Sequence, residues 1–131
     1  MSQSRSSAER FVFERLLAAL PSDQYAIHDS VEWMAVPSAP PGRAEGEIDF
    51  VICHRTRGVL VLEVKGGGVE FDTATGEWWS IDRHGARHAI ADPMRQARQS
   101  ARHLVGALKD AVGGFLPIPV GSAVAFPDVR W

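Results

Sequence analysis

The sequence has little cysteine, little lysine and no long apolar run. The single cysteine, Cys53, cannot form an internal disulfide, and it sits in an apolar run typical of a buried thiol in a reducing compartment. No apolar stretch approaches the roughly 20 residues of a membrane-spanning helix. The polar N-terminus also lacks the apolar stretch of a secretory signal. We therefore expect a cytoplasmic protein with no membrane association.

Charge is unevenly distributed along the chain. The net charge of −2 does not by itself indicate a nucleic-acid-binding protein. Only two of the fourteen basic residues are lysines, so twelve are arginines, and five of these fall between residues 83 and 102. This segment predicts a phosphate-facing patch, although a solvated helix face is the simpler interpretation. The candidate nucleic-acid-binding residues in it are Arg95, Arg98 and Arg102.

The order of expected elements indicates an α/β fold. Helical spacing of apolar residues begins at Ala8 and ends at Pro21. Asp92-Pro93 predicts the start of a second helix, which Gly113-Gly114 ends. The expected strands cover residues 25–36, 48–54, 59–65, 69–71, 77–81 and 120–126, with a loop over residues 37–46. We predict a flexible leader at residues 1–7 and one domain over residues 8–131, built as a mixed sheet flanked by helices. The chain ends soon after an apolar strand and has no polar tail, which suggests a domain cut from a longer protein, with a short natural chain as the alternative.

Acidic residues and a lysine meet at the open end of one expected hairpin. If the turn over residues 55–58 is centred near Thr56, Asp49 lies across from Glu63, and Glu47 lies across from Lys65. Side chains alternate between faces, so all four then project from one face. A slip of one residue would remove Asp49 from this set.

This set of residues suits phosphodiester hydrolysis. Two carboxylates at cross-strand distance bind a hard cation such as Mg²⁺, which polarises the phosphodiester and lowers the pKa of water. The neighbouring Lys65 can orient water or neutralise charge on the phosphate, and the Val64 carbonyl can complete the shell. A surface salt bridge to Lys65 is the alternative. The glycine triplet after Lys65 favours the site, because glycines let another backbone or a substrate come close.

Several segments resemble the nuclease-related domain (NERD) family, which belongs to the PD-(D/E)xK nuclease superfamily. The two segments around the acidic set are Glu47-Ile48-Asp49-Phe50-Val51 and Arg57-Gly58-Val59-Leu60-Val61-Leu62-Glu63-Val64-Lys65-Gly66-Gly67. Residues 9–16 resemble the family's first helix, and Asp92-Pro93-Met94-Arg95-Gln96-Ala97 resembles the start of its later helix. The segment Val124-Ala125-Phe126-Pro127-Asp128-Val129 is similar to the stretch after the last core strand in members fused to DNA helicases.

The resemblance implies a restriction-endonuclease-like αβββαβ core and Mg²⁺- or Mn²⁺-dependent hydrolysis of DNA. It implies that Asp49, Glu63 and Lys65 form the catalytic site, which Glu9 and Gln96 join from the two helices. Stabilisation of the helix N-terminus is an alternative role for Glu9, and Gln96 could be an ordinary surface residue. Some related nucleases carry a tyrosine four residues after the glutamine, where this chain has Ser100. A C-terminal helicase domain is an implied partner.

Two other functions are compatible with the sequence. The chain could be a nucleic-acid-binding module of a helicase-linked protein without catalytic activity, or a protein-interaction scaffold with a structural salt bridge at Lys65. A zinc site at His84 and His88 is not expected, because Gly85 interrupts them and the segment 82–88 is predicted to form a turn. Trp78 and Trp79 should point to opposite faces of a strand, with core packing favoured over stacking on a base.

Overall fold

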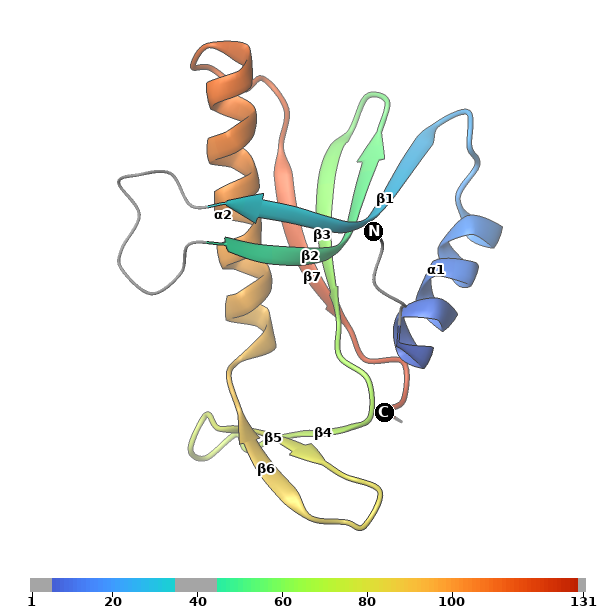
Figure 1. Ribbon diagram of the computed structural model, residues 1–131, viewed down its shortest axis with the longest axis vertical. Coiled ribbons are helices and arrows are strands. Elements are labelled where there is room, and N and C mark those ends of the chain that lie inside the picture. Colours follow the sequence, from blue (N-terminus) through green and yellow to red (C-terminus); the bar gives the residue numbers. More distant parts are fainter. Residues whose placement is uncertain (1–5, 35–44, 130–131) are drawn as a thin grey trace.

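The structure is a computed structural model of the 131-residue chain and describes residues 6–34 and 45–129. It contains two helices and seven strands in these ranges: α1 (Ser7–Ala19), β1 (Tyr25–Met34), β2 (Glu45–His54), β3 (Gly58–Val64), β4 (Gly68–Phe71), β5 (Trp78–Ile81), β6 (Arg87–Ile90), α2 (Pro93–Val112) and β7 (Val120–Ala125). The expected αβββαβ order is confirmed, with a small three-stranded insertion between β3 and α2 (Figure 1).

The main sheet is mixed and has the strand order β1-β2-β3-β7. The β1–β2 and β2–β3 pairs are antiparallel, whereas β3 and β7 are parallel. The strands β2 and β3 are the central ones, and helices cover both of their faces. This agrees with their nearly continuous runs of aliphatic residues.

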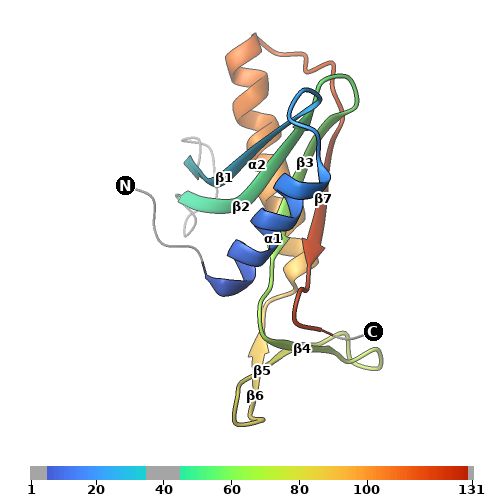
Figure 2. The same ribbon diagram turned by 90° about the vertical axis from the view of Figure 1, so that its right-hand side faces the viewer.

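The two helices cover opposite faces of this sheet (Figure 2). On the α1 face, Val12 packs in a buried cluster with Phe50, Ile52 and Leu62. On the other face, which lies against α2, a second cluster contains Ile48, Val51, Val61 and Ala101. The core is therefore divided into two layers by β2 and β3.

Local signals set the ends of both helices. Ser6 caps α1 by accepting a hydrogen bond from the Glu9 backbone N–H at 3.2 Å, so α1 begins at Ser7. The helix therefore includes the last residue of the predicted leader. Asp92 caps α2, with Pro93 in its first turn, as predicted. Gly113 ends α2 in the left-handed conformation, with φ of 85°.

The insertion is a separate sheet with the order β4-β5-β6. The predicted hairpin of β4 and β5 is confirmed, but Arg87 and His88 belong to β6 and not to a turn. Trp78 stacks on Phe126, which follows β7, with ring centroids 5.9 Å apart. This contact ties the small sheet to the end of the main sheet.

On β5, Trp79 lies under the guanidinium of Arg87, 4.5 Å from the ring centroid. The same guanidinium pairs with Glu70 at 3.1 Å. Arg87 therefore has both an aromatic and an acidic partner within the small sheet. His88 Nε2 likewise lies 2.9 Å from Asp82 Oδ2.

The predicted loop over residues 37–46 and the predicted leader over residues 1–7 can be compared with the structure only in part. Glu45 and Gly46 begin β2, so the predicted loop over residues 37–46 is wrong for these two. The rest of that loop, the Trp33 side chain and most of the predicted leader lie outside what the structure describes. Among the described residues, neither helix has the length and apolar character needed to cross a membrane.

Candidate metal and phosphodiester site

The predicted register of the acidic hairpin is confirmed. The β2–β3 ladder runs from His54–Gly58 to Phe50–Leu62, and the next pair in this register is Asp49 with Glu63. At that point the two strands part, since β2 continues to pair with β1 as far as Glu45. The Asp49 carboxylate fills the opening, where its Oδ2 accepts a hydrogen bond from the Val64 backbone N–H at 2.8 Å.

The separation of the ladders changes one expected pairing. Glu47 is exposed and lies across from Glu32 of β1. The recorded β2–β3 ladder ends before a Glu47–Lys65 pair could form. The prediction that Glu47 pairs across from Lys65 is therefore not supported, because β2 turns away from β3 first.

The backbone opposite Asp49 explains how β2 bends here. By register Ser30 faces Asp49, and its φ of 51° is the only positive value among the described non-glycine residues. Beyond this point Val31 and Ile48 belong to the α2-side cluster, although Phe50 belongs to the α1-side cluster. Strict alternation would put Ile48 and Phe50 on one face. The strand pair thus switches faces at the position of Asp49.

Glu63 is the most perturbed titratable group at this site. Burial raises its pKa, and the adjacent Asp49 carboxylate raises it further, to about 8. The Ser100 hydroxyl and Lys65 act in the opposite direction, favouring the charged form. Glu63 Oε1 is buried and has no hydrogen-bond partner among the described residues. Uncompensated negative charge is therefore costly at this position.

Such an arrangement fits a hard divalent cation. Asp49 and Glu63 supply oxygen donors, and the unpartnered Oε1 gains a partner when a positive charge lies between the carboxylates. No group of three or more His, Cys, Asp or Glu side chains arranged to hold a metal ion occurs within residues 6–34 and 45–129. Two carboxylates suit Mg²⁺, which keeps several of its waters in proteins.

Val64 and Lys65 extend the site along β3. The N–H and C=O of one strand residue point to the same flank, and the Val64 N–H points to Asp49. We therefore expect the Val64 carbonyl on the same side. The Lys65 N–H points the other way and donates to the Ala125 carbonyl at 2.9 Å. The half-buried Lys65 side chain lies close enough to lower the pKa of Glu63.

The glycines after Lys65 allow close approach, as predicted. A Cβ atom on Gly66 would lie 2.7 Å from Ala8 Cβ, so this glycine lets α1 approach β3. Glu9 follows Ala8 in the first turn of α1 and is half-buried. Gly67 donates its N–H to Asp128 Oδ2 at 2.8 Å. Asp128 is a contact that sequence reasoning missed, although it lies in a segment quoted for the family resemblance.

On α2, Gln96 and Ser100 are one turn apart. Gln96 is half-buried in the first turn of the helix, and Ser100 is buried, with only 8% of its surface exposed. The sequence presented Ser100 only as a departure from a tyrosine in related nucleases. The structure brings its hydroxyl to Glu63. The feature of the sequence that could have identified Ser100 is its position as a polar residue between the small apolar residues Ala97 and Ala101.

A family model described as the nuclease-related domain matches residues 4–127. The chain belongs to the NERD family. This membership indicates a nuclease-related function, and the mixed sheet with its two helices is compatible with a restriction-endonuclease-like fold. Neither a curated protein nor a solved structure matches the chain significantly.

The arginines of this NERD domain lie on a different flank of α2. Arg98 and Arg102 line a groove of about 320 Å³ together with Val120, Gly121 and Ser122 of β7. None of the acidic-site residues lines it. Arg95 is exposed on the same helix. The structure therefore does not bring these arginines together with Asp49 and Glu63.

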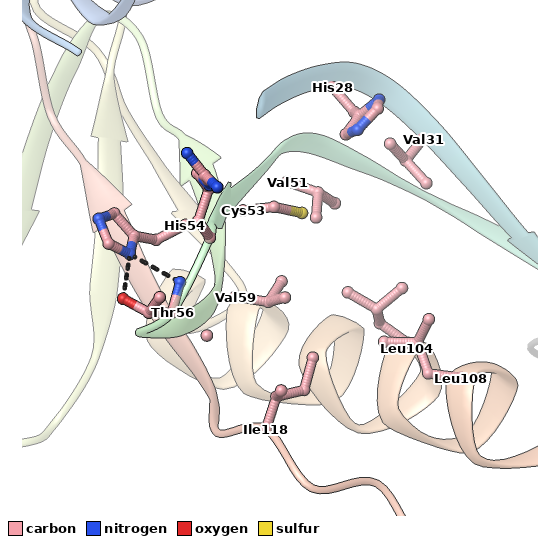
Figure 3. A pocket seen from close by; sticks show the side chains of 12 residues that line it. His28, Val31, Val51, Cys53, His54, Thr56, Val59, Leu104, Leu108 and Ile118 are labelled. Atoms are coloured by element: carbon pink, nitrogen blue, oxygen red, sulfur yellow. Dashed lines mark hydrogen bonds between the residues drawn. The ribbon is translucent and has the colours of Figure 1, made fainter. Parts of the chain in front are cut away.

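A larger hollow of about 540 Å³ lies near the hairpin turn of the NERD domain (Figure 3). Its lining is mainly apolar and includes Val51, Cys53, Val59, Leu104 and Leu108. The Cys53 thiol is half-buried, and burial raises its pKa. Asp49, Glu63 and Lys65 do not line this hollow. A search for the functional site by the volume of the hollow alone would therefore have missed the acidic site.

Proposed function

We propose that this NERD domain is a Mg²⁺- or Mn²⁺-dependent deoxyribonuclease. The observation that carries the proposal is the proximity of the Asp49 carboxylate to Glu63, whose buried Oε1 has no partner, just beyond the last pair of the β2–β3 ladder. Lys65 comes two positions after Glu63, directly after the end of β3. Strongly perturbed carboxyl groups of this kind cluster at functional sites.

The roles of the residues follow from their positions. Asp49 and Glu63 would hold the cation, with the Val64 carbonyl as a third oxygen donor. A bound Mg²⁺ or Mn²⁺ supplies charge that polarises the phosphodiester and makes water more acidic. Lys65 orients the attacking water and stabilises negative charge that develops on the phosphate. Glu9 and Gln96 approach from α1 and α2 and help to orient these groups.

The reaction is a direct attack of water on phosphorus. The water oxygen forms a bond to phosphorus while the bond from phosphorus to the leaving sugar oxygen breaks. The water loses one proton and the leaving oxygen gains one, so the products are an alcohol and a phosphate monoester. No covalent intermediate with the protein is required.

The cleavage test uses one lysine as the target and the other as its control. Supercoiled plasmid and single-stranded DNA are incubated with Mg²⁺ or Mn²⁺, and cleavage should stop when EDTA is added. Lys65→Met should lower the rate by about 10²-fold or more, whereas Lys109→Met, at the far end of α2, should retain it. Cleavage that survives both EDTA and Lys65→Met would come from a contaminant and would overturn the assignment.

We further propose that DNA phosphates lie in the groove of Arg98 and Arg102. The segment from Pro93 to Lys109 contains three arginines and no acidic residue, so this part of α2 attracts a polyanion. Replacing both groove arginines with alanine should weaken DNA binding and reduce its salt dependence, by about one unit of slope per lost phosphate contact. Arg57→Ala, at the exposed hairpin turn, is the control.

The same assays separate the two candidate functions. Salt-sensitive DNA retention without cation-dependent cleavage would favour a binding module, for example one that guides a linked helicase. The separate position of the arginine groove makes this second function physically possible. Loss of both activities, with no effect of cations on thermal stability, would leave the interaction scaffold.

A further inference from the structure

Four residues of α2 are buried, and three of them are apolar. These are Pro93, Ala97 and Ala101, and the fourth is Ser100. Small side chains let α2 lie close to the sheet, where Ala101 joins the cluster of Val61. Alanine would fill the position of Ser100 as well, and buried hydroxyl groups normally have a hydrogen-bond partner. Ser100 is the one polar residue among the buried described residues.

The position of Ser100 gives its hydroxyl an acidic neighbour. The Glu63 carboxyl group interacts with the Asp49 carboxylate from β2 and with the Ser100 hydroxyl from α2. Because Glu63 Oε1 has no partner, we assign the Ser100 interaction to Oε2. A hydroxyl that donates to one oxygen fixes the side-chain rotamer. The other oxygen, Oε1, is then left buried and without a partner.

We propose that Ser100 is a positioning residue, whose hydroxyl holds Glu63 in the orientation that presents Oε1 to a divalent cation shared with Asp49. The inference rests on the proposed function, because it adds Ser100 to the residues of the proposed cation site. Groups that hydrogen-bond to a metal ligand orient it, and their loss weakens metal binding. Serine in a helix has an alternative partner, the carbonyl four residues earlier, which here belongs to Gln96.

The test measures cation affinity and does not depend on DNA cleavage. Metal-free protein is titrated with Mn²⁺ in a calorimeter, and its thermal unfolding is followed without the cation. Ser100→Ala should weaken Mn²⁺ binding about ten- to one hundred-fold, with little change in unfolding of the metal-free protein. Ser100→Thr keeps the hydroxyl and should restore most of the affinity. Ser80→Ala removes a half-buried hydroxyl from β5 and should bind like the wild type.

The comparison of wild type with Ser100→Ala decides the question. Equal affinities would overturn the positioning role, leave the cation site intact and point to the Gln96 carbonyl as the partner. Weakened Mn²⁺ binding by Ser80→Ala would also count against it, because the loss of any half-buried hydroxyl would then have the same effect. Absence of Mn²⁺ binding by the wild type would overturn this inference together with the proposed metal site.

Discussion

The Asp49 carboxylate accepts a hydrogen bond from the Val64 backbone N–H. It takes the place of a backbone carbonyl of β2, which no longer pairs with β3 at this point. Its Oδ2 lies 2.8 Å from the Val64 nitrogen, although Asp49 is one residue and Val64 two residues beyond the last pair of the β2–β3 ladder. Asp49 therefore has a structural task as well as the proposed chemical one. The two tasks can be separated, because only one of them requires the negative charge.

Replacement of Asp49 by asparagine or alanine should separate these tasks. Asparagine keeps an oxygen that can accept from Val64, whereas alanine leaves a part-buried N–H without a partner, at a cost of about 1–3 kcal/mol. We expect Asp49→Ala to lower the free energy of unfolding by that amount and Asp49→Asn by much less, as measured by urea denaturation. Both variants should lose Mn²⁺ binding. Equal stability of the two variants would show that the hydrogen bond contributes little.

The raised pKa of Glu63 predicts how stability depends on pH. The folded protein holds this proton up to a pKa of about 8, whereas the ordinary value for the group is 4.5. Between these values the folded state binds more protons than the unfolded state, so the contribution to stability is full below pH 4.5 and is lost as pH rises through 8. Glu63→Gln should remove this decline in the metal-free protein and be the more stable form at pH 8. Parallel stability curves for the two proteins from pH 5 to 8 would contradict this.

The same pKa predicts a proton coupled to cation binding. Near pH 7 the metal-free site retains a proton that a bound Mn²⁺ should displace. Calorimetric titrations in buffers with different ionisation enthalpies should report the release of about one proton per cation at pH 7. The number should fall toward zero above pH 9. Release that does not vary with pH would mean that Glu63 is already charged.

Two glycine substitutions test the packing of α1 beside the site. Gly66→Ala would bring its Cβ to within 2.7 Å of Ala8 Cβ, so α1 must shift and we expect loss of stability and weaker Mn²⁺ binding. Gly106→Ala is the matched control, because nothing lies within 4 Å of its added Cβ in the middle of α2. It should stabilise the protein by about 0.5–1 kcal/mol. Thermal unfolding of both variants measures these changes in stability. If Gly66→Ala were as stable as the wild type, the close contact between Gly66 and Ala8 would be refuted.

Much of the fold could be predicted because its signals are local. Asp92-Pro93 and Gly113 determine the ends of α2 within a few residues. The register of β2 and β3 follows from a short turn and alternating side chains, so Asp49 and Glu63 could be placed opposite each other from the sequence. The strand β6 was missed, since Arg87–Ile90 has no alternation of apolar and polar residues and forms only by pairing with β5.

The unpredicted parts of the site depend on contacts between distant segments. Ser100 lies 37 positions after Glu63, and no local pattern shows that their side chains meet; only the packing of α2 on β3 does. The separation of β2 from β3 was also not foreseeable. It coincides with the positive φ of Ser30, which by register faces Asp49 and which the sequence of β1 does not require. Glu47 was misplaced because of this separation.

Asp128 has a practical consequence for anyone who divides this chain into parts. The family match ends at residue 127, yet the carboxylate of the following residue accepts the N–H of Gly67, two positions after Lys65. A fragment trimmed to the matched segment would keep every acidic residue of the proposed site. It would nevertheless lose the Asp128 carboxylate, which accepts the hydrogen bond from the Gly67 N–H next to Lys65. The working boundary of the domain thus lies beyond the boundary that sequence comparison draws.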